Sequence, residues 1–270
     1  MQLPATERAR LLRGYGPWAL VTGASSGIGR ELATQLAVAG LHLVLCARSG
    51  AALEAFSEEL RARYRIEVAV LAVDLGTDEG PEAVVAATRD RDIGLLVCAA
   101  GFGTSGRFTD TALSDELDLL RLNCLALLHL THHFSRRFAA QRRGGIILLS
   151  SIVAFQGVPY AANYAASKAY VQSLAEALAV ELRPAGVAVL AAAPGPVRSG
   201  FGERAHMQMG AALLPNEVAV PILQALGRRT TVLPGFLSKL LTWALRTVPR
   251  AGKVRIMAMV MGGMTRHQRS

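Results

Sequence analysis

From Trp18 onward, short apolar runs alternate with amphipathic segments at intervals of roughly 25 to 30 residues. Strands that alternate with helices form right-handed βαβ units, which build a parallel sheet with helices on both faces. The expected strands are Ala19–Thr22, Leu41–Cys46, Val68–Val73, Ile93–Cys98, Gly145–Ser150 and Val187–Ala193. The expected helices are Ile28–Ala39, Ala51–Arg63, Pro81–Thr88, Ser114–Ala140 and Tyr160–Arg183. The pattern predicts an α/β fold: one domain over residues 1–270 with a doubly wound parallel sheet, preceded by a lead-in at 1–17.

The composition suits such a sheet. Hydrophobic residues make up 51% of the chain and the mean hydropathy is +0.32, as expected when parallel strands are buried on both faces. No apolar run reaches the roughly 18 residues of a membrane-spanning helix, and the N-terminus lacks the apolar run of a secretion signal. The three cysteines are odd in number and widely spaced, which suits a reducing compartment. We therefore expect a cytoplasmic protein.

A glycine-rich turn follows the first expected strand. Gly23, Gly27 and Gly29 in the segment Thr22–Gly29 permit a tight turn and let a dinucleotide pyrophosphate approach the backbone. The helix that opens there adds the positive end of its dipole. This turn predicts a nicotinamide dinucleotide site whose remaining members are Ser25, Ser26 and Ile28.

The second expected strand ends at Ala47 and Arg48, where sites that take NAD usually offer an acid to the ribose 2′-hydroxyl. An arginine there accommodates a 2′-phosphate instead, so NADP(H) is favoured over NAD(H). The alternative is an ordinary solvated arginine at a helix start.

Three further segments lie where a cofactor would pass. Asp74 and Leu75 follow the third strand, and the Asp74 carboxylate either meets the adenine or caps the next segment. Small residues, Ala99, Ala100 and Gly101, follow the fourth strand. Asn123 lies inside the expected helix Ser114–Ala140, where asparagine is a poor interior residue, so it either kinks the helix or binds water.

Tyr164 and Lys168 are four residues apart in an expected helix, so their side chains share one face. A nearby ammonium group lowers the pKa of a phenol toward the range of general acid–base chemistry. The alternative is a buried tyrosine beside a solvated lysine. Ser151 precedes the tyrosine by 13 residues and follows the fifth expected strand.

Taken together, these segments resemble the short-chain dehydrogenase/reductase family over about residues 17–200. The matching residues are Thr22–Gly29, Asp74, Ala99–Gly101, Asn123, Ser151, Tyr164, Lys168, Pro194 and Gly195. The resemblance implies one Rossmann-type domain, usually seven-stranded, and a dimer or tetramer. It also implies that Tyr164 is the general acid/base and that Ser151 forms a hydrogen bond with the substrate oxygen. Lys168 would lower the pKa of the tyrosine and bind the nicotinamide ribose, and Asn123 would hold a water in the proton relay.

Two positions depart from the family pattern. Cys98 stands where the family has asparagine, and a thiol cannot replace both the donor and the acceptor of an amide. Ser199 replaces a threonine but keeps a hydroxyl that can contact the nicotinamide carboxamide. By the resemblance, Pro194, Gly195, Val197 and Ser199 complete the cofactor site, and residues 197–215 form a substrate loop.

Six of the seven methionines lie beyond residue 206, namely Met207, Met209, Met257, Met259, Met261 and Met264. Flexible, polarizable methionines suit an adaptable apolar surface, which favours a lipid-like substrate. The alternative is that they fill a core.

The net charge of +9 belongs to the C-terminal fifth, because residues 218–270 carry nine basic side chains and no acidic one. The segment Phe236–Arg246, in the basic and apolar extension 228–270, has polar residues on one side of a helix. It fits an interfacial helix on an anionic membrane, an alternative to the preferred interpretation of a helix packed on the domain or on another subunit. An acidic carrier or a phosphorylated substrate is a third partner. No recognition motif accompanies the charge, so nucleic acid is not expected.

His129, His132 and His133 have helical spacing but no carboxylate between them, so no metal site is expected. The sequence thus predicts an NADP(H)-dependent enzyme that interconverts a carbonyl and an alcohol, on a small-molecule substrate that is apolar or lipid-like. The competing class is a non-catalytic NADP(H)-binding sensor or scaffold that docks through its basic tail.

Overall fold

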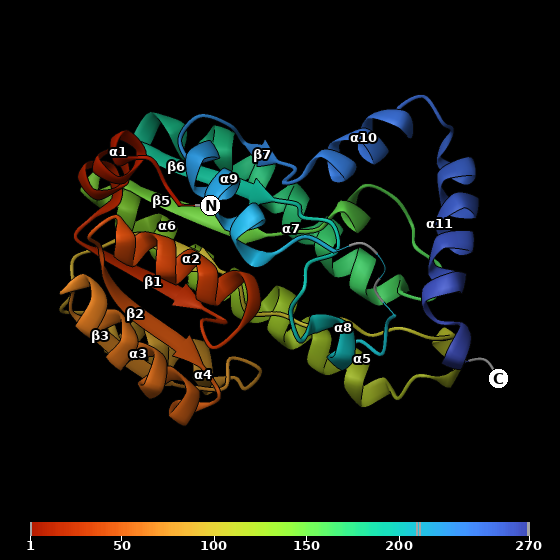
Figure 1. The fold of residues 1–270 in the computed structure, drawn as a ribbon, viewed down its shortest axis with the longest axis horizontal. Helices are drawn as coiled ribbons and strands as arrows, with labels where there is room; N and C mark the ends of the chain where they lie inside the picture. Colours follow the sequence, from red (N-terminus) through yellow and green to blue (C-terminus); the bar gives the residue numbers. More distant parts are fainter. Residues whose placement is uncertain (1, 209, 211, 269–270) are drawn as a thin grey trace.

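Seven parallel strands form one sheet in the order β3-β2-β1-β4-β5-β6-β7. The structure is a computed structural model that describes residues 2–208, 210 and 212–268, without the side chains of residues 237 and 267. The strands are β1 (Trp18–Thr22), β2 (His42–Ala47), β3 (Val68–Ala72), β4 (Ile93–Cys98), β5 (Gly144–Leu149), β6 (Val187–Ala192) and β7 (Thr231–Val232). The order reverses between β1 and β4, so their carboxyl ends diverge into helices on opposite faces and leave a crevice between them. Figure 1 shows the strands running side by side with helices on both faces.

The six strands predicted from apolar runs are confirmed to within one residue at each end. The seventh was not predicted. β7 has two residues, Thr231 and Val232, which add to the edge of the sheet through β6. An edge strand this short carries no apolar run that a sequence pattern can detect.

The helices that cover the sheet belong to two groups. On one face lie α1 (Ala5–Tyr15), α2 (Gly27–Val38), α3 (Gly50–Tyr64) and α9 (Pro215–Ala225). On the other lie α4 (Glu79–Ala87), α6 (Leu127–Gln141) and α7 (Ala162–Glu181). The remaining helices, α5 (Leu113–Leu120), α8 (Phe201–Arg204), α10 (Phe236–Ala244) and α11 (Arg250–Met264), lie toward the carboxyl edge of the sheet (Figure 1).

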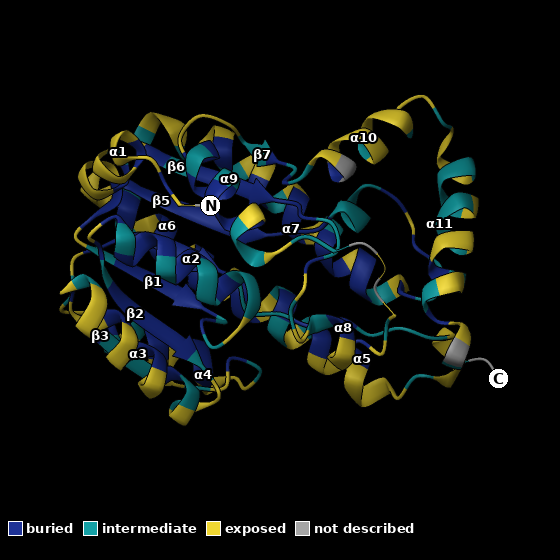
Figure 2. Cartoon of the chain, in the orientation of Figure 1, coloured by how far each residue is buried: buried dark blue, intermediate teal, exposed yellow. Residues whose placement is uncertain are grey.

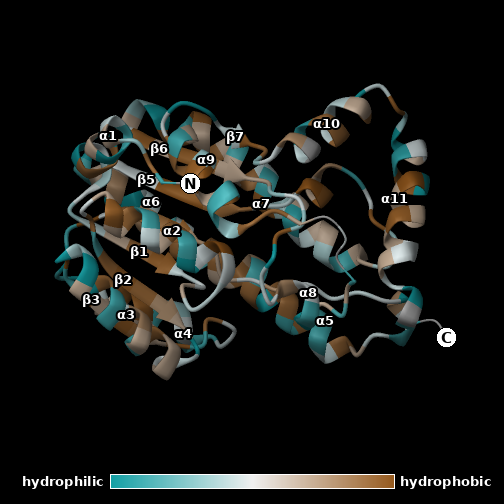
Figure 3. Cartoon of the chain, viewed as in Figure 1, coloured by the Kyte–Doolittle hydropathy of each residue, from teal (hydrophilic) through white to brown (hydrophobic). Residues whose placement is uncertain are grey.

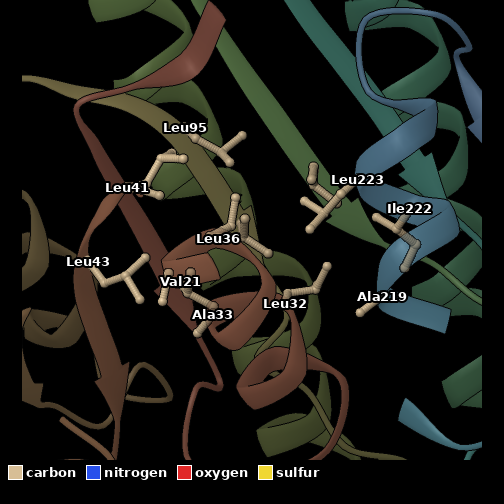
Figure 4. Packing of buried hydrophobic residues seen from close by; sticks show 14 of the residues in the cluster. Val21, Leu32, Ala33, Leu36, Leu41, Leu43, Leu95, Ala219, Ile222 and Leu223 are labelled. Carbon is tan, nitrogen blue, oxygen red and sulfur yellow. The ribbon is translucent and has the colours of Figure 1, made fainter. Parts of the chain in front are cut away.

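Each face has its own apolar core. Figure 4 shows one of them, where Leu32 and Leu36 of α2 meet Ile222 and Leu223 of α9 above the sheet. All four side chains are fully buried. Strand residues alternate between the two cores, so Val21 belongs to this core and Leu20 to the opposite one.

The predicted helix Ser114–Ala140 is continuous but changes its winding. α5 passes into a π-helical segment, Arg121–Ala126, which then passes into α6. Asn123 lies in that segment, as the expectation of an irregularity at this asparagine indicated. Such π-helical turns are frequent at functional sites.

α10 and α11 form an arm beyond the carboxyl edge of the sheet, apart from the helices that cover its faces (Figure 1). The predicted helix Phe236–Arg246 is confirmed as α10, but its apolar side is not packed on the domain: Phe236 and Trp243 are exposed. Among the described residues, no helix is both long enough and apolar enough to cross a bilayer.

The packing of α9 on α2 yields a stability prediction. Leu223→Ala removes a fully buried side chain, so we expect the free energy of unfolding to fall by about 2–5 kcal/mol. The matched control is Leu240→Ala on the exposed side of α10, for which we expect a change of less than about 0.5 kcal/mol. Denaturant unfolding measures both, and equal losses would contradict the assigned core.

Candidate active site

A cavity of about 660 Å³ lies at the carboxyl edge of the sheet, where the strand order reverses. Every residue predicted to contact the cofactor lines this cavity: Gly23, Ser25, Ser26, Gly27, Ile28, Gly29, Arg48, Asp74, Leu75, Ala99, Ala100, Gly101, Tyr164, Lys168, Pro194, Gly195, Val197 and Ser199. They come from the segments that follow β1, β2, β3, β4 and β6 and from helix α7, which follows β5. The fold therefore brings together segments separated by more than half of the chain.

The carboxyl ends of β1 and β4 are joined by the Thr22 hydroxyl. It donates a hydrogen bond to the Val97 carbonyl (3.4 Å) and accepts one from each of the Ala99 and Ala100 amides (3.1 Å each). Gly23 follows with a φ of 67°, and a β-carbon there would lie 2.8 Å from the Ala100 backbone. Only glycine fits this close approach between the two loops.

The next turn brings the start of α2 against the end of β1. A β-carbon on Gly29 would lie 2.3 Å from the Gly23 carbonyl oxygen, so the helix can approach only because position 29 has no side chain. This closeness directs the free amides at the start of α2 into the cavity. The cradle fits a dinucleotide pyrophosphate, which needs backbone donors and the positive end of a helix.

Two arginines flank the far end of the cavity. Arg48 is exposed and lines it with Asp74, and Arg204 reaches the same place from α8. The Arg204 guanidinium lies 3.9 Å from the centre of the Phe102 ring. Burial and then the positive charge of Arg48 lower the pKa of Arg204, while Asp74 opposes this shift. Two cations so placed favour an anionic group between them.

Asp74 also has a local role. Its Oδ1 atom accepts a hydrogen bond from the Gly76 amide at 2.9 Å, which forms the turn after β3. The two roles that the sequence left open for Asp74 are therefore compatible, because the same residue closes the turn and lines the cavity.

Ser151, Tyr164 and Lys168 line the same cavity, between the arginines and the apolar side chains of α10 and α11. The Lys168 ammonium donates a hydrogen bond to the Leu149 carbonyl at 2.8 Å and lies 5.8 Å from the centre of the Tyr164 ring. The Ser151 and Tyr164 side chains are hydrogen-bonded to each other. All three side chains are buried, and all three line the cavity.

The pKa values differ from the expectation that Lys168 lowers the pKa of Tyr164. Burial raises the pKa of Tyr164 to about 12, and the hydrogen bond with Ser151 offsets this only in part. Burial likewise lowers the pKa of Lys168 to about 8. The desolvation of both side chains outweighs the attraction of the ammonium for a phenolate, since Lys168 points toward the Leu149 carbonyl.

Asn123 lies behind the cavity and does not line it. Its amide group accepts a hydrogen bond from the Phe102 amide (3.1 Å) and donates to the Phe102 carbonyl (2.8 Å) and the Ser167 hydroxyl (3.2 Å). These bonds tie the π-helical segment to the loop after β4. The Asn123 side chain thus positions that loop, and the relay water expected from the resemblance stays a prediction.

Cys98 is buried in the core beside Cys46 and does not line the cavity. Burial raises the pKa of its thiol to about 12, so it stays neutral. The loop after β4 receives its support from Thr22 and Asn123 instead.

The wall facing Tyr164 is apolar and was largely not predicted. Phe201 lies with its ring centre 5.3 Å from that of Tyr164, and Met207, Met257, Met261 and Met264 line the same part of the cavity. Met261 and Tyr164 also belong to one packed cluster, so both interpretations of the methionines hold in part. Met259 is exposed, and Met209 lies outside the described residues.

Sequence reasoning missed Arg204, Phe201 and the wall formed by α10 and α11. Arg204 follows no strand and belongs to no recognised spacing, so only the position of α8 reveals it. The expected substrate loop 197–215 does supply Phe201, Arg204 and Met207.

Comparisons with known proteins agree with this geometry. A family model described as short chain dehydrogenase matches residues 17–209. A 7beta-hydroxysteroid dehydrogenase from Collinsella aerofaciens is 29% identical over 82% of this chain and 87% of its own. A very-long-chain 3-oxoacyl-CoA reductase from Meyerozyma guilliermondii is 33% identical over 84% of this chain and 70% of its own. A short-chain dehydrogenase from Sphingobium yanoikuyae, solved in complex with NADPH, superposes with a TM-score of 0.78 at 29% identity, covering 87% of this chain and 98% of that one.

These relatives are dehydrogenases and reductases, which favours an enzyme over a non-catalytic sensor. The family model covers most of the chain, and strands β1 to β6, the glycine turn and the Ser151–Tyr164–Lys168 cluster lie within it. The chain belongs to the short-chain dehydrogenase/reductase family and is an NAD(P)-dependent oxidoreductase that acts on CH–OH and C=O groups.

Proposed function

We propose that the protein uses NADP(H) to interconvert a carbonyl and an alcohol on an apolar substrate, with Tyr164 as general acid/base. The observation that supports this most is the meeting of Ser151, Tyr164 and Lys168 with the glycine-lined groove in one cavity. The relatives that act on hydroxysteroids and on very-long-chain acyl groups have substrates of the same apolar kind.

The chain's own residues would hold the substrate oxygen and move its proton. The nicotinamide, when bound, supplies or accepts the hydride. In reduction, Tyr164 would donate the phenolic proton to the carbonyl oxygen while Ser151 donates a hydrogen bond to the same atom. The Lys168 ammonium would then stabilise the phenolate that remains, and a pKa of about 12 for Tyr164 keeps the phenol protonated before the step. In oxidation the phenolate would take the proton back.

The preference for NADP(H) rests on Arg48 and Arg204. Both line the end of the cavity where the adenosine ribose of a bound dinucleotide would lie, and Asp74 is the acid beside them. A 2′-phosphate would relieve the repulsion between the two guanidinium groups, whereas a 2′-hydroxyl would leave it in place.

An apolar substrate is supported by the wall opposite Tyr164. Phe201, Met257 and Met261 offer flexible apolar surface around the reacting oxygen.

We also propose that the protein is cytoplasmic and forms a homo-oligomer. Leu113 at the start of α5, Leu125 in the π-helical segment and Val180 near the end of α7 are exposed, and a second copy would cover such apolar side chains.

The cofactor preference is tested by the binding of NADPH and NADH to Arg48→Ala and Arg204→Ala. We expect the affinity for NADPH to fall by about tenfold or more in each, because a hydrogen-bonded charge is lost, with little change for NADH. Arg198→Ala is the matched control, since Arg198 lies on the same loop but is exposed and does not line the cavity. Equal losses for both cofactors would contradict the assignment.

The role of Tyr164 is tested by turnover of an apolar ketone panel. Tyr164→Phe should lower kcat by at least about 100-fold while the NADPH Kd changes little, because only proton transfer is removed. Tyr170→Phe, an exposed position on the same helix, should leave kcat unchanged. Binding without turnover in the wild type across the whole panel would favour the sensor instead.

Lys168 gives a pH dependence. Its pKa of about 8 means that the ammonium is charged below that pH and neutral above it, and the charged form attracts the anionic cofactor. The value of kcat/KM for NADPH reports groups of the free enzyme, so it should decline as the pH rises through about 8. Lys168→Met should lack this decline. A decline that persists unchanged in the variant would assign it to another group.

A further inference from the structure

α10 buries a polar side chain and exposes apolar ones, which is the reverse of a helix that packs on its own domain. Ser238 is 3% exposed and faces inward, whereas Phe236 and Trp243 are 78% and 72% exposed. An amphipathic helix on a domain surface normally buries its apolar side. Figure 2 colours most of α10 as exposed, and Figure 3 shows hydrophobic residues along the same helix.

The exposed apolar surface of α10 continues on α11. Leu241 of α10 and Val260 of α11 both line the cavity, and both are about half exposed. The cavity therefore opens to the outside between the two helices. We call the exposed apolar side chains of α10 and α11 the mouth surface; it consists of Phe236, Leu240, Leu241, Trp243, Met259 and Val260, of which Leu241 and Val260 line the cavity.

Basic side chains accompany the mouth surface. Lys239, Arg246, Arg250 and Arg255 are exposed on the same two helices and the turn between them, and the sequence has no acid between residues 218 and 270. Within the described residues, no carboxylate forms an ion pair with any of them. An exposed tryptophan, apolar neighbours and unpaired cations are the features of an interfacial helix on an anionic bilayer.

We propose that α10 and α11 dock on an anionic membrane and open the mouth of the cavity to the lipid. The apolar side chains would insert at the level of the headgroups, and the four cations would pair with lipid phosphates. Entry of an apolar carbonyl substrate by this route rests on the function proposed above. The docking itself rests only on the surface.

A second copy of this chain fits the mouth surface less well. A two-fold dimer brings the same patch of both subunits together, so Lys239 and Arg246 of each would face a basic surface with no acid to pair with. Exposed apolar side chains with acids nearby exist elsewhere: Leu113 and Leu125 lie in the same continuous helical segment as Asp115, Asp118 and Arg121.

The arm is also in contact with the reaction site. A β-carbon on Gly195 would lie 2.6 Å from the Ser238 hydroxyl, so α10 rests directly on the segment that would hold the nicotinamide. At its other end, α11 is followed by Gln268, whose amide donates a hydrogen bond to the Ser105 hydroxyl at 2.9 Å. Docking on a bilayer would therefore place the mouth at the lipid surface with the arm already fixed to the domain at both ends.

Vesicle co-sedimentation tests the proposal without substrate or cofactor. The probes are vesicles of phosphatidylcholine alone and of phosphatidylcholine with about 30% phosphatidylglycerol, at low and high salt. We expect binding to the anionic vesicles, weakened by salt and lowered by roughly tenfold or more in the double variant Lys239→Glu/Arg246→Glu. Arg63→Glu/Arg89→Glu changes the net charge equally at exposed positions outside α10 and α11 and should bind like wild type.

Insertion is measured by the fluorescence of Trp243 in a Trp18→Phe background, because the chain has only these two tryptophans. A blue shift on anionic vesicles is expected, and Phe236→Ser should reduce vesicle binding. Equal binding to neutral and anionic vesicles, or no blue shift, would overturn the proposal. The proposal would also be overturned if the wild type self-associated and did not bind vesicles, and if a mouth-surface variant lost that self-association in light scattering. A second copy of the chain would then cover the mouth surface.

Unchanged NADPH binding in the variants shows that they are folded. Turnover of a water-soluble ketone, which needs no vesicle, separates a failure of docking from a failure of the proposed function.

Discussion

The buried Thr22 hydroxyl ties the carboxyl end of β1 to the loop after β4, beside the cavity, where the backbone pairing of the two strands ends. Its three hydrogen bonds join the end of β1 to the end of β4 and fix the loop Ala99–Gly101. The close approach at Gly23 depends on this junction, and the start of α2 is in turn packed on Gly23 through Gly29. The cofactor cradle is therefore a consequence of how tightly two strand ends meet. A wider junction would move the helix amides away from the groove.

Much of the fold and of the site was accessible from the sequence, because each depended on local signals. The six longer strands are continuous apolar runs, and the residues that carry the chemistry follow those strands by rule. β7 could not be predicted because two residues are too few to show a periodic pattern. Arg204 could not be predicted because its position depends on where α8 lies, which no spacing in the sequence encodes. The orientation of α10 could not be predicted either, because a sequence pattern identifies which residues share a side of the helix but not which side faces the domain.

The spacing of Tyr164 and Lys168 in the sequence predicts that they share a helix face, but not which groups their side chains bind. Four-residue spacing placed both side chains on one face, as expected, but the Lys168 ammonium donates its hydrogen bond to the Leu149 carbonyl and lies 5.8 Å from the centre of the Tyr164 ring. Burial then dominates both pKa values. Asn123 was likewise noticed for being unusual inside a helix, and its bonds to Phe102 show that the irregularity serves to hold the neighbouring loop. In both cases the sequence identified the residue, and the hydrogen-bond partner decided its role.

The cavity extends from the exposed Arg48 at one end to Leu241 and Val260 at the other, and the two ends meet different parts of the surface. On the function proposed above, a dinucleotide would occupy the Arg48 end and an apolar substrate the end at Leu241 and Val260, so the two ligands would reach Tyr164 from different sides.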